Sequence, residues 1–306
     1  MVTIKQLRYL VAISDQLHFR RAAEQVHISQ PTLSGQLREM EEKLGVQLVE
    51  RSRARVLLTP IAAEISERAR DILRSVDDIV ELAKQGHSHL GGTFRLGVLP
   101  SLGPYLLPHF LPALHKSYPR LKLYVREAIP AALIHDLEDG KLDILLFPLP
   151  ITRADLEHVR IFLEPLWVVA PSDHTMARRK TVRREDLTHQ TVLALERGHR
   201  LHDQVRHLCE EFNADVSLDF EGSSLDTLRQ MVAMGLGISF LPSLYVSAEI
   251  SDNDTSVVAR KLDHGNPSRV IGMVWRRHSA RIREFIELSD FIRDSLKGMQ
   301  DIVTLR

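Results

Sequence analysis

The sequence predicts an N-terminal, all-α winged helix-turn-helix with a long linker helix behind it, and a C-terminal α/β domain of two subdomains. Three patterns carry this prediction. Residues 19–45 hold two short helical stretches, Pro60 begins one long amphipathic helix, and strands alternate with helices from residue 91 onward. A length of 306 residues allows two domains with a substantial core.

The two short helices of residues 19–45 are joined by a tight turn. Ala22 in the first helix is small enough for a second helix to cross closely. Ser29 is a good N-cap for that second helix, and Pro31 fits its first turn, where a missing N–H costs little. Gly45 is a plausible stop. The second helix carries one apolar stripe: Leu33, Leu37, Met40 and Leu44.

The opposite face of the second helix begins with short polar side chains, and these are Gln30, Thr32, Ser34, Gln36 and Arg38. Such residues at the start of a helix suit contact with base edges in a major groove. We therefore expect base contacts from Gln30, Thr32, Ser34 and Gln36, and a phosphate contact from Ser29. The alternative is an ordinary amphipathic helix with a polar surface.

A short two-stranded wing is predicted after Gly45, because Val46 and Leu48 and then residues 56–58 flank a polar tip. Arginines at this tip could bind phosphates, which positions a protein on DNA without specifying a sequence. The expected phosphate contacts are Arg51, Arg53 and Arg55. The alternative is a solvated basic turn. Residues 1–60 hold nine basic and six acidic side chains, whereas the whole chain has zero formal net charge, so DNA contact should be local.

Pro60 opens a helix that we expect to reach about Gln85. Its apolar positions follow steps of three and four residues, close to a heptad seam: Ile61, Ile65, Ala69, Ile72, Val76, Ile79 and Ala83. The other faces are charged, so the seam should bury itself against a second copy of the helix. The alternative is packing onto the protein's own body. Residues 86–92, GHSHLGG, should end the helix as a hinge.

Beyond the hinge, apolar runs predict nine strands with helices between several of them. The expected strands are Thr93–Leu99, Leu121–Glu127, Leu142–Phe147, Phe162–Ala170, Thr191–Leu195, Ser217–Glu221, Ile238–Leu241, Val257–Lys261 and Val270–Trp275; the expected helices are Pro104–Ser117, Ala131–Asp139, Leu201–Phe212 and Leu225–Met234. About 215 residues is large for one sheet. We therefore expect two subdomains, with a small-molecule site in the cleft between them, lined by loops at the carboxyl ends of strands.

The block AAEQVHISQPTLSGQLREMEEKLGVQL, the wing with Arg51 and Arg55, and the LLTP entrance to the linker helix resemble LysR-type transcriptional regulators over the whole chain. Val49 and the pair Ala62–Ala63 depart from that family's usual residues, which suggests altered local packing. The resemblance implies a homodimer or homotetramer on promoter DNA, with RNA polymerase as a further candidate partner. It implies no enzymatic activity and no cofactor.

The resemblance also implies domain boundaries. Residues 1–59 would form the DNA-binding domain and residues 60–90 the linker helix and hinge. Residues 91–306 would form an effector-binding domain that resembles periplasmic binding proteins. Its lobe I would comprise residues 91–163 and 269–306, and its lobe II residues 164–268.

Within the family, GVLPSLGPYLLPHFLPAL, GKLD and LALERGHRLHDQ are similar to the OxyR-like peroxide regulators. In that branch a reactive cysteine follows the Gly-His pair and a second cysteine resolves it. Here Arg200 follows Gly198 and His199, and Cys209 occupies the resolving position. A switch that needs an internal disulfide cannot run with one sulfur. We therefore expect a small-molecule sensor that does not use that chemistry.

The resemblance also implies an effector cleft, whose residues are carried over by position from that family. They are Leu99, Pro100, Ser101, Ala128, Pro130, His199, Arg200 and Ser223. Arg200 could bind an anionic ligand through paired hydrogen bonds, or it could pair within the protein and hold one conformation. Cys209 is expected to be a half-buried structural residue, with an intermolecular redox role as the minority alternative. The spacing of His199, His202 and Cys209 is poor for a metal, so no metal site is expected.

No apolar run reaches the length of a membrane span, and no secretory signal pattern is present, which favours a cytoplasmic protein without membrane contact. The single cysteine suits a reducing compartment. The competing hypothesis is a metabolite-binding protein or enzyme whose N-terminal helices serve only for assembly. It predicts ligand binding without a sequence-selective DNA complex.

Overall fold

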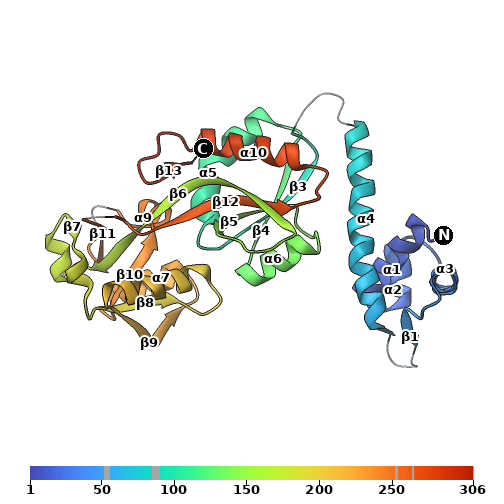
Figure 1. Ribbon diagram of the computed structural model, residues 1–306, viewed down its shortest axis with the longest axis horizontal. Coiled ribbons are helices and arrows are strands. Elements are labelled where there is room, and N and C mark those ends of the chain that lie inside the picture. The colour runs from blue at the N-terminus through green and yellow to red at the C-terminus, as the bar shows by residue number, and fades with distance from the viewer. Residues whose placement is uncertain (52–55, 85–89, 252–253, 264, 306) are drawn as a thin grey trace. The chain divides into compact units, whose positions relative to one another are not determined.

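The computed structural model describes residues 1–51, 56–84, 90–251, 254–263 and 265–305. The chain divides into two compact units, Met1–Ser88 and His89–Arg306. Figure 1 shows the first unit as a group of helices with a small wing, and the second as twisted sheets covered by helices. This is the predicted combination of a helix-turn-helix and an α/β domain.

The N-terminal unit packs four helices and a wing around a small apolar core. Its elements are α1 (Ile4–Gln16), α2 (Phe19–Gln25), α3 (Gln30–Leu44), β1 (Val49–Arg51), β2 (Val56–Leu58) and α4 (Pro60–Lys84). The core side chains Leu10, Ile13, Ala22, Leu33 and Met40 are at most 1% exposed. Small and branched residues at helical spacing therefore bring α1, α2 and α3 into close contact, as the sequence predicted.

The turn into α3 follows the expected capping chemistry. The Ser29 hydroxyl accepts a hydrogen bond from the Thr32 backbone N–H at 3.3 Å, and Gly45 ends the helix with a φ of 68°. One expectation is wrong in detail, since Leu44 is 38% exposed and the buried stripe ends at Met40. The first wing strand begins at Val49, and Val46 is 37% exposed. The last turn of α3 and the residue after Gly45 lie on the surface, where no core needs them.

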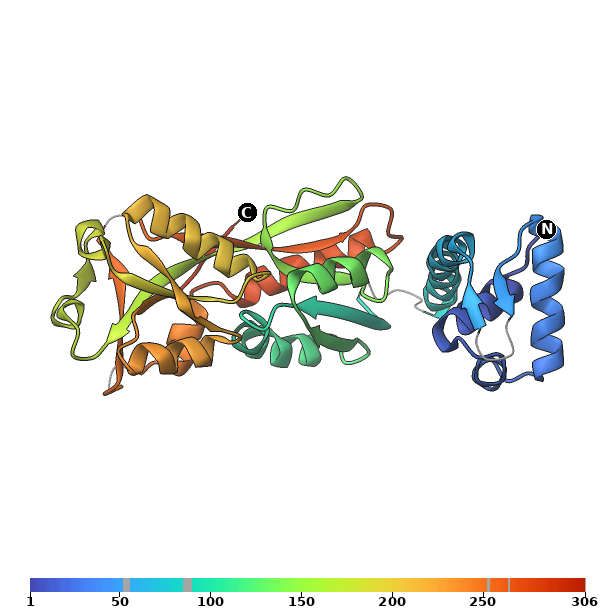
Figure 2. The ribbon, with the colours of Figure 1, turned by 90° about the horizontal axis from the view of Figure 1, so that it is seen from below.

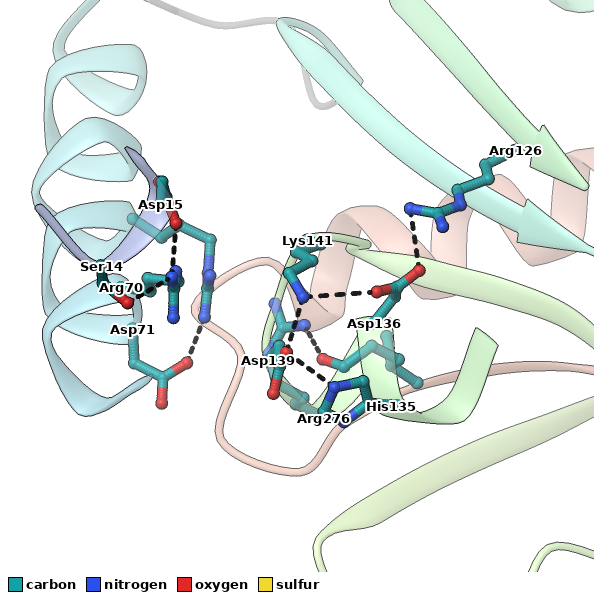
Figure 3. Close-up of polar contacts among 12 residues, drawn as sticks. Ser14, Asp15, Arg70, Asp71, Arg126, His135, Asp136, Asp139, Lys141 and Arg276 are labelled. Atoms are coloured by element: carbon teal, nitrogen blue, oxygen red, sulfur yellow. Dashed lines mark hydrogen bonds and ion pairs between the residues drawn. The ribbon is translucent and has the colours of Figure 1, made fainter. Parts of the chain in front are cut away.

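Helix α4 packs against α1 through small residues on one of its faces. Ala62, Ser66 and Ala69 are at most 1% exposed. The Arg70 guanidinium donates to Asp15 Oδ1 at 2.6 Å and to Ser14 Oγ at 3.3 Å, which Figure 3 shows. Ala69 was expected in the self-pairing seam, so that assignment is wrong for this position. The alternative of packing onto the protein's own body therefore holds for one face of α4.

The C-terminal unit alternates strands and helices. Its elements are β3 (Thr93–Val98), α5 (Gly103–Ser117), β4 (Lys122–Glu127), α6 (Pro130–Glu138), β5 (Ile144–Leu149), β6 (Leu156–Pro171), η1 (Thr175–Arg178), β7 (Thr181–Val182), η2 (Arg184–Leu187), β8 (Thr191–Leu195), α7 (Arg200–Phe212), β9 (Asp215–Gly222), α8 (Leu225–Ala233), β10 (Ile238–Pro242), α9 (Ser243–Glu249), β11 (Val257–Leu262), β12 (Ser268–Arg276), α10 (Ile282–Ser295) and β13 (Val303–Thr304). Each expected strand and helix is present, with shifted ends.

Strand β6 has 16 residues and belongs to both halves of this unit. The strands follow the order β4-β3-β5-β12-β6-β10-β8-β9. The first ten residues of β6 pair with β12, and its last six pair with β10 or β11. Figures 1 and 2 show β6 and β12 running side by side between the two groups of strands. The chain thus crosses between the halves within these two strands.

Two separate apolar cores flank this crossing. One gathers buried residues of β3, α5, β5, β12 and α10, and the other gathers those of β8, α7, α8, β10 and β11. Helix α9 lies at the junction, because Leu244 belongs to the first core and Tyr245 to the second. The rings of Tyr105 and Tyr245 meet edge to face with centroids 5.1 Å apart. We call the first half lobe I and the second lobe II.

Candidate DNA-binding surface and effector cleft

The polar side of α3 faces outward in the N-terminal unit. Gln30, Thr32 and Arg38 are exposed, and Ser34 and Gln36 are partly exposed. Figure 2 shows α3 and α4 on opposite sides of this unit, with α4 seen nearly end-on. The residues that the sequence assigned to base contacts are therefore all accessible. Gln30 and Ser34 lie on one flank of the helix, and Thr32 and Gln36 lie on the other, because successive residues of an α-helix are turned by about 100°.

Local hydrogen bonds already orient part of this face. The hydroxyls of Ser29 and Thr32 lie 2.7 Å apart, and the Gln36 amide donates to Glu39 Oε2 at 3.0 Å. Sequence reasoning missed Gly35, where an added Cβ would meet no atom within 4 Å. A glycine inside a helix costs up to about 1 kcal/mol of stability, and this cost was the sequence signal that could have identified it. The missing side chain leaves room for another molecule to approach the α3 backbone closely.

The structure describes the wing only in part. The backbone of Arg51 ends β1, and β1 pairs with β2 in antiparallel register. The expected phosphate contacts at Arg53 and Arg55 lie outside the described residues. The first of these two strands begins only a few residues after α3.

In lobe I, five of the expected cleft residues gather at one sheet edge. Strands β3 and β4 are parallel, with Val98 opposite Glu127, so the loops that follow them begin side by side. These loops and the start of α6 carry Leu99, Ser101, Ala128 and Pro130, and Pro100 lies between the first two. Ser101 and Pro130 are buried and Ala128 is partly buried.

In lobe II, His199 and Ser223 occupy the matching positions after β8 and β9. These strands are also parallel, with Leu195 opposite Gly222. His199 is 7% exposed, whereas Ser223 is exposed. Loops after two pairs of parallel strands, one pair in each lobe, thus carry the expected cleft residues.

Helix α7 bridges the two lobes next to these loops. The Arg200 guanidinium donates to the Pro150 carbonyl, after β5 of lobe I, at 2.6 Å. The Gln204 side chain donates to the Ser268 carbonyl at 2.8 Å. Of the two alternatives for Arg200, the structure therefore shows pairing within the protein.

A buried ion pair at the lobe junction escaped sequence reasoning. Arg269 Nε donates to Glu164 Oε2 at 2.8 Å, and both side chains are at most 3% exposed. The remaining guanidinium nitrogens donate to the Ser101 hydroxyl at 3.2 Å and to its carbonyl at 2.8 Å. Glu164 Oε1 accepts from the Leu244 backbone at 3.2 Å. This network fixes Ser101 to the crossing strands and to α9.

Cys209 lies on the buried side of α7, where it is 2% exposed. Burial, together with the smaller effect of the Asp215 and Glu210 carboxylates, raises the pKa of its thiol to about 12. Thiolate is the nucleophilic form of cysteine, so at neutral pH this side chain is a small apolar core residue. The geometry favours the structural interpretation of Cys209 over a redox role.

We therefore expect native Cys209 to react with a thiol reagent at pH 7.5 at least about a thousandfold more slowly than in the unfolded chain, since each pKa unit changes the thiolate fraction about tenfold. Absorbance during reaction with a disulfide reagent, with and without guanidinium, measures both rates. Peroxide should also leave DNA affinity within about twofold, in the protein and in Cys209→Ser alike. Rapid native labelling, or a peroxide response lost in Cys209→Ser, would contradict this expectation.

The described residues contain no group of three or more His, Cys, Asp or Glu side chains that could hold a metal ion. Among the described helices, none has the length and apolar character needed to cross a membrane.

Comparison with known proteins agrees with this geometry. Residues 4–63 match the family described as bacterial regulatory helix-turn-helix protein, lysR family, and residues 87–297 match the LysR substrate binding domain. The chain belongs to the LysR family of DNA-binding transcriptional regulators, which combine these two parts. Family membership does not favour the competing assembly-only hypothesis for the N-terminal helices.

Within the family, the chain is similar to OxyR proteins. It is 40% identical to the DNA-binding transcriptional dual regulator OxyR of Escherichia coli K12 over 302 residues, which cover 99% of this chain and 98% of that protein. It is 38% identical to the hydrogen peroxide-inducible genes activator of Pectobacterium carotovorum, covering 99% and 100%. A full-length OxyR variant from Pseudomonas aeruginosa superposes with a TM-score of 0.79 at 33% identity, covering 100% and 98%.

Proposed function

We propose that this regulator contacts promoter bases through Gln30, Thr32, Ser34 and Gln36 and phosphates through Ser29, Arg51, Arg53 and Arg55. The outward polar face of α3 carries this proposal, because the opposite face of the helix fills the core of the N-terminal unit. Base edges in a major groove are recognised by side chains of this kind at the start of such a helix. A regulator of chromosomal promoters acts in the cytoplasm of a bacterial cell.

Substitution of two of these residues separates base contact from phosphate contact. Gln30→Ala should weaken binding to a specific operator about fivefold to a hundredfold, and should leave binding to random DNA almost unchanged. Arg51→Ala should weaken binding to both and flatten the dependence of affinity on salt by about one unit. Gel shifts at several salt concentrations, on the promoter upstream of the protein's own gene, measure both effects.

The matched control is Gln16→Ala, which removes an exposed glutamine at the end of α1. It should change neither affinity by more than about twofold. If neither Gln30→Ala nor Arg51→Ala alters DNA affinity, the proposed surface is wrong.

We also propose that the protein assembles through two surfaces. On α4, Ile61, Ile72 and Ile79 are 42%, 44% and 64% exposed, which supports pairing with a second α4. The edge strands β4 and β9 expose further apolar side chains: Tyr124, Val125, Leu218 and Phe220. Exposed edges and apolar patches commonly mark contact surfaces. Together the two surfaces support a homotetramer bound to DNA. RNA polymerase would be a further partner of that assembly.

We further propose that an effector binds between the lobes, among the cleft residues named above, and that Arg200 holds the lobes together instead of sensing peroxide. The hydrogen bond from Arg200 to Pro150 supports the first part of this role, because it joins α7 to lobe I. The burial of Cys209, nine residues further along α7, supports the second part, because a buried thiol is a poor target for peroxide. The proposal keeps the expected domain division. Residues 1–59 form the DNA-binding domain, residues 60–90 the linker helix and hinge, residues 91–163 and 269–306 lobe I, and residues 164–268 lobe II. A thermal-shift screen of small metabolites tests it, because a cleft ligand must raise apparent stability by mass action.

A further inference from the structure

Lobe II contains a second concave site, a pocket of about 450 Å³, in the size range of small-molecule sites. None of the proposed cleft residues lines it. The lining residues are Trp167, Ala177, Arg178, Arg179, Lys180, Thr181, Ala259, Arg260 and Lys261. Five of the nine are arginine or lysine, and the described lining includes no acidic side chain. We call this site the basic pocket.

Regular structure frames the basic pocket on three sides. Strand β11 pairs antiparallel with β6, which carries Trp167, and parallel with β7, where Lys261 lies opposite Thr181. The η1 turn that leads into β7 is anchored by Met176, which is 2% exposed. The cations are therefore presented by a folded scaffold of strands rather than by a loose loop.

The charges of the pocket are held in place but are mostly not neutralised. Arg179 Nη1 bonds both Asp186 oxygens, at 2.7 and 3.0 Å. The Arg260 guanidinium donates to the carbonyls of Arg179, Ala259 and Ala177 at 2.6, 2.8 and 3.0 Å, which orients it without cancelling its charge. Lys261 Nζ lies 4.6 Å from the centroid of the Trp167 ring.

Within the described part of the chain, Arg178, Lys180, Arg260 and Lys261 have no ion pair with a carboxylate. Four cations around one concavity repel each other and create a strong local positive potential. A bound anion with several negative charges would remove that repulsion. Guanidinium groups with a fixed orientation suit the oxygens of phosphate, to which they can donate in pairs.

We propose that the basic pocket binds a small anion that carries two or more linked phosphate groups. One phosphate carries a charge of about −2 and would leave about half of the four charges uncompensated. A diphosphate or triphosphate carries more charge and can reach cations on both β11 and the η1–β7 segment. The site lies outside the proposed effector cleft, so this ligand would be additional to the effector. The inference does not depend on which residues contact DNA.

Titration of the full-length protein with inorganic tripolyphosphate tests the proposal. Calorimetry should show saturable binding at one site per chain, and orthophosphate should bind at least tenfold more weakly. The emission of Trp167 should change on binding. The second tryptophan, Trp275, is 4% exposed in the core of lobe I and should contribute a constant background.

Two matched double variants decide whether the pocket is responsible. Arg178→Gln with Lys180→Gln removes two pocket cations and should weaken tripolyphosphate binding at least tenfold. Lys116→Gln with Arg120→Gln removes the same charge from exposed positions of lobe I and should change it less than twofold. Gel shifts with both variants monitor the DNA function separately.

Three outcomes would overturn the inference. If tripolyphosphate binding does not saturate, or if both double variants weaken that binding equally, the result indicates general attraction to a basic surface. If the protein does not bind tripolyphosphate and the pocket variant loses DNA affinity, the pocket cations contact nucleic acid instead. In each case the proposed contacts of α3 remain open to their own test.

Discussion

Replacing Ile72 and Ile79 by aspartate will halve the mass of the assembly in solution and lower its affinity for a two-half-site operator by about a hundredfold or more. Positions 61, 72 and 79 are separated by 11 and 7 residues, which places them within about 20° of one another around a helix. These isoleucines stay exposed in the single chain, while small residues bury the neighbouring face of α4 on α1. A second α4 is the partner that such a seam fits.

Aspartate in that seam would leave two unpaired carboxylates per helix in an apolar contact, which the assembly cannot tolerate. Loss of pairing removes the second DNA-binding unit, and with it the gain in affinity that two linked half-sites provide. Light scattering measures the mass, and a gel shift measures the affinity.

The control is Ala63→Asp, which adds a carboxylate to an exposed position on the opposite side of α4. It should preserve both the mass and the DNA affinity. An undiminished mass after the double substitution would show that α4 does not form the self-contact.

Removing the carboxylate of Glu164 will lower the free energy of unfolding of the C-terminal unit by about 3–5 kcal/mol, because Glu164→Ala leaves the guanidinium of Arg269 charged and buried. The pair is almost fully enclosed. The Leu244 backbone N–H loses its acceptor, and Arg269, which binds Ser101, loses its ion-pair partner. Urea unfolding followed by the emission of the two tryptophans, both in this unit, measures the change.

Two comparisons give this prediction its specificity. Glu157→Ala removes the partner of Arg277 in an ion pair of 3.5 Å whose side chains are 44% and 49% exposed, and should cost less than about 1 kcal/mol. Glu164→Leu combined with Arg269→Met should recover much of the lost stability, because a well-packed apolar pair can replace a buried ion pair. Equal costs for Glu164→Ala and Glu157→Ala would show that burial does not set the strength of the pair.

Local signals account for the parts of the fold that the sequence predicted. The N-cap at Ser29, the glycine stop at Gly45 and the apolar stripe of α3 each act within a few residues, so they can be recognised without knowing the rest of the chain. The same holds for the alternating strands and helices. Helix α10 was not named in advance, although its buried positions Phe285, Leu288 and Ile292 follow a helical spacing.

Long-range partners account for most of what the sequence did not predict. Glu164 and Arg269 are 105 residues apart, and neither belongs to a recognisable motif. Arg200 was recognised as unusual, but its hydrogen-bond acceptor is a backbone carbonyl. Every residue has such a carbonyl, so the sequence could not identify which one accepts the bond. The double use of β6 was missed because its first residues, LEHVRI, alternate apolar with polar or charged side chains, so the strand was predicted to begin only at Phe162.

The continuity of β6 limits how lobes I and II can move. The chain passes between the two cores within β6 and β12, so a reorientation of the lobes must twist this two-stranded ribbon or bend it near Pro165, opposite Ser268. Torsion of a hydrogen-bonded ribbon spreads over several residues and resists shear. A signal that arises between the lobes would consequently take the form of a rotation about the ribbon axis, with little sliding of one lobe past the other.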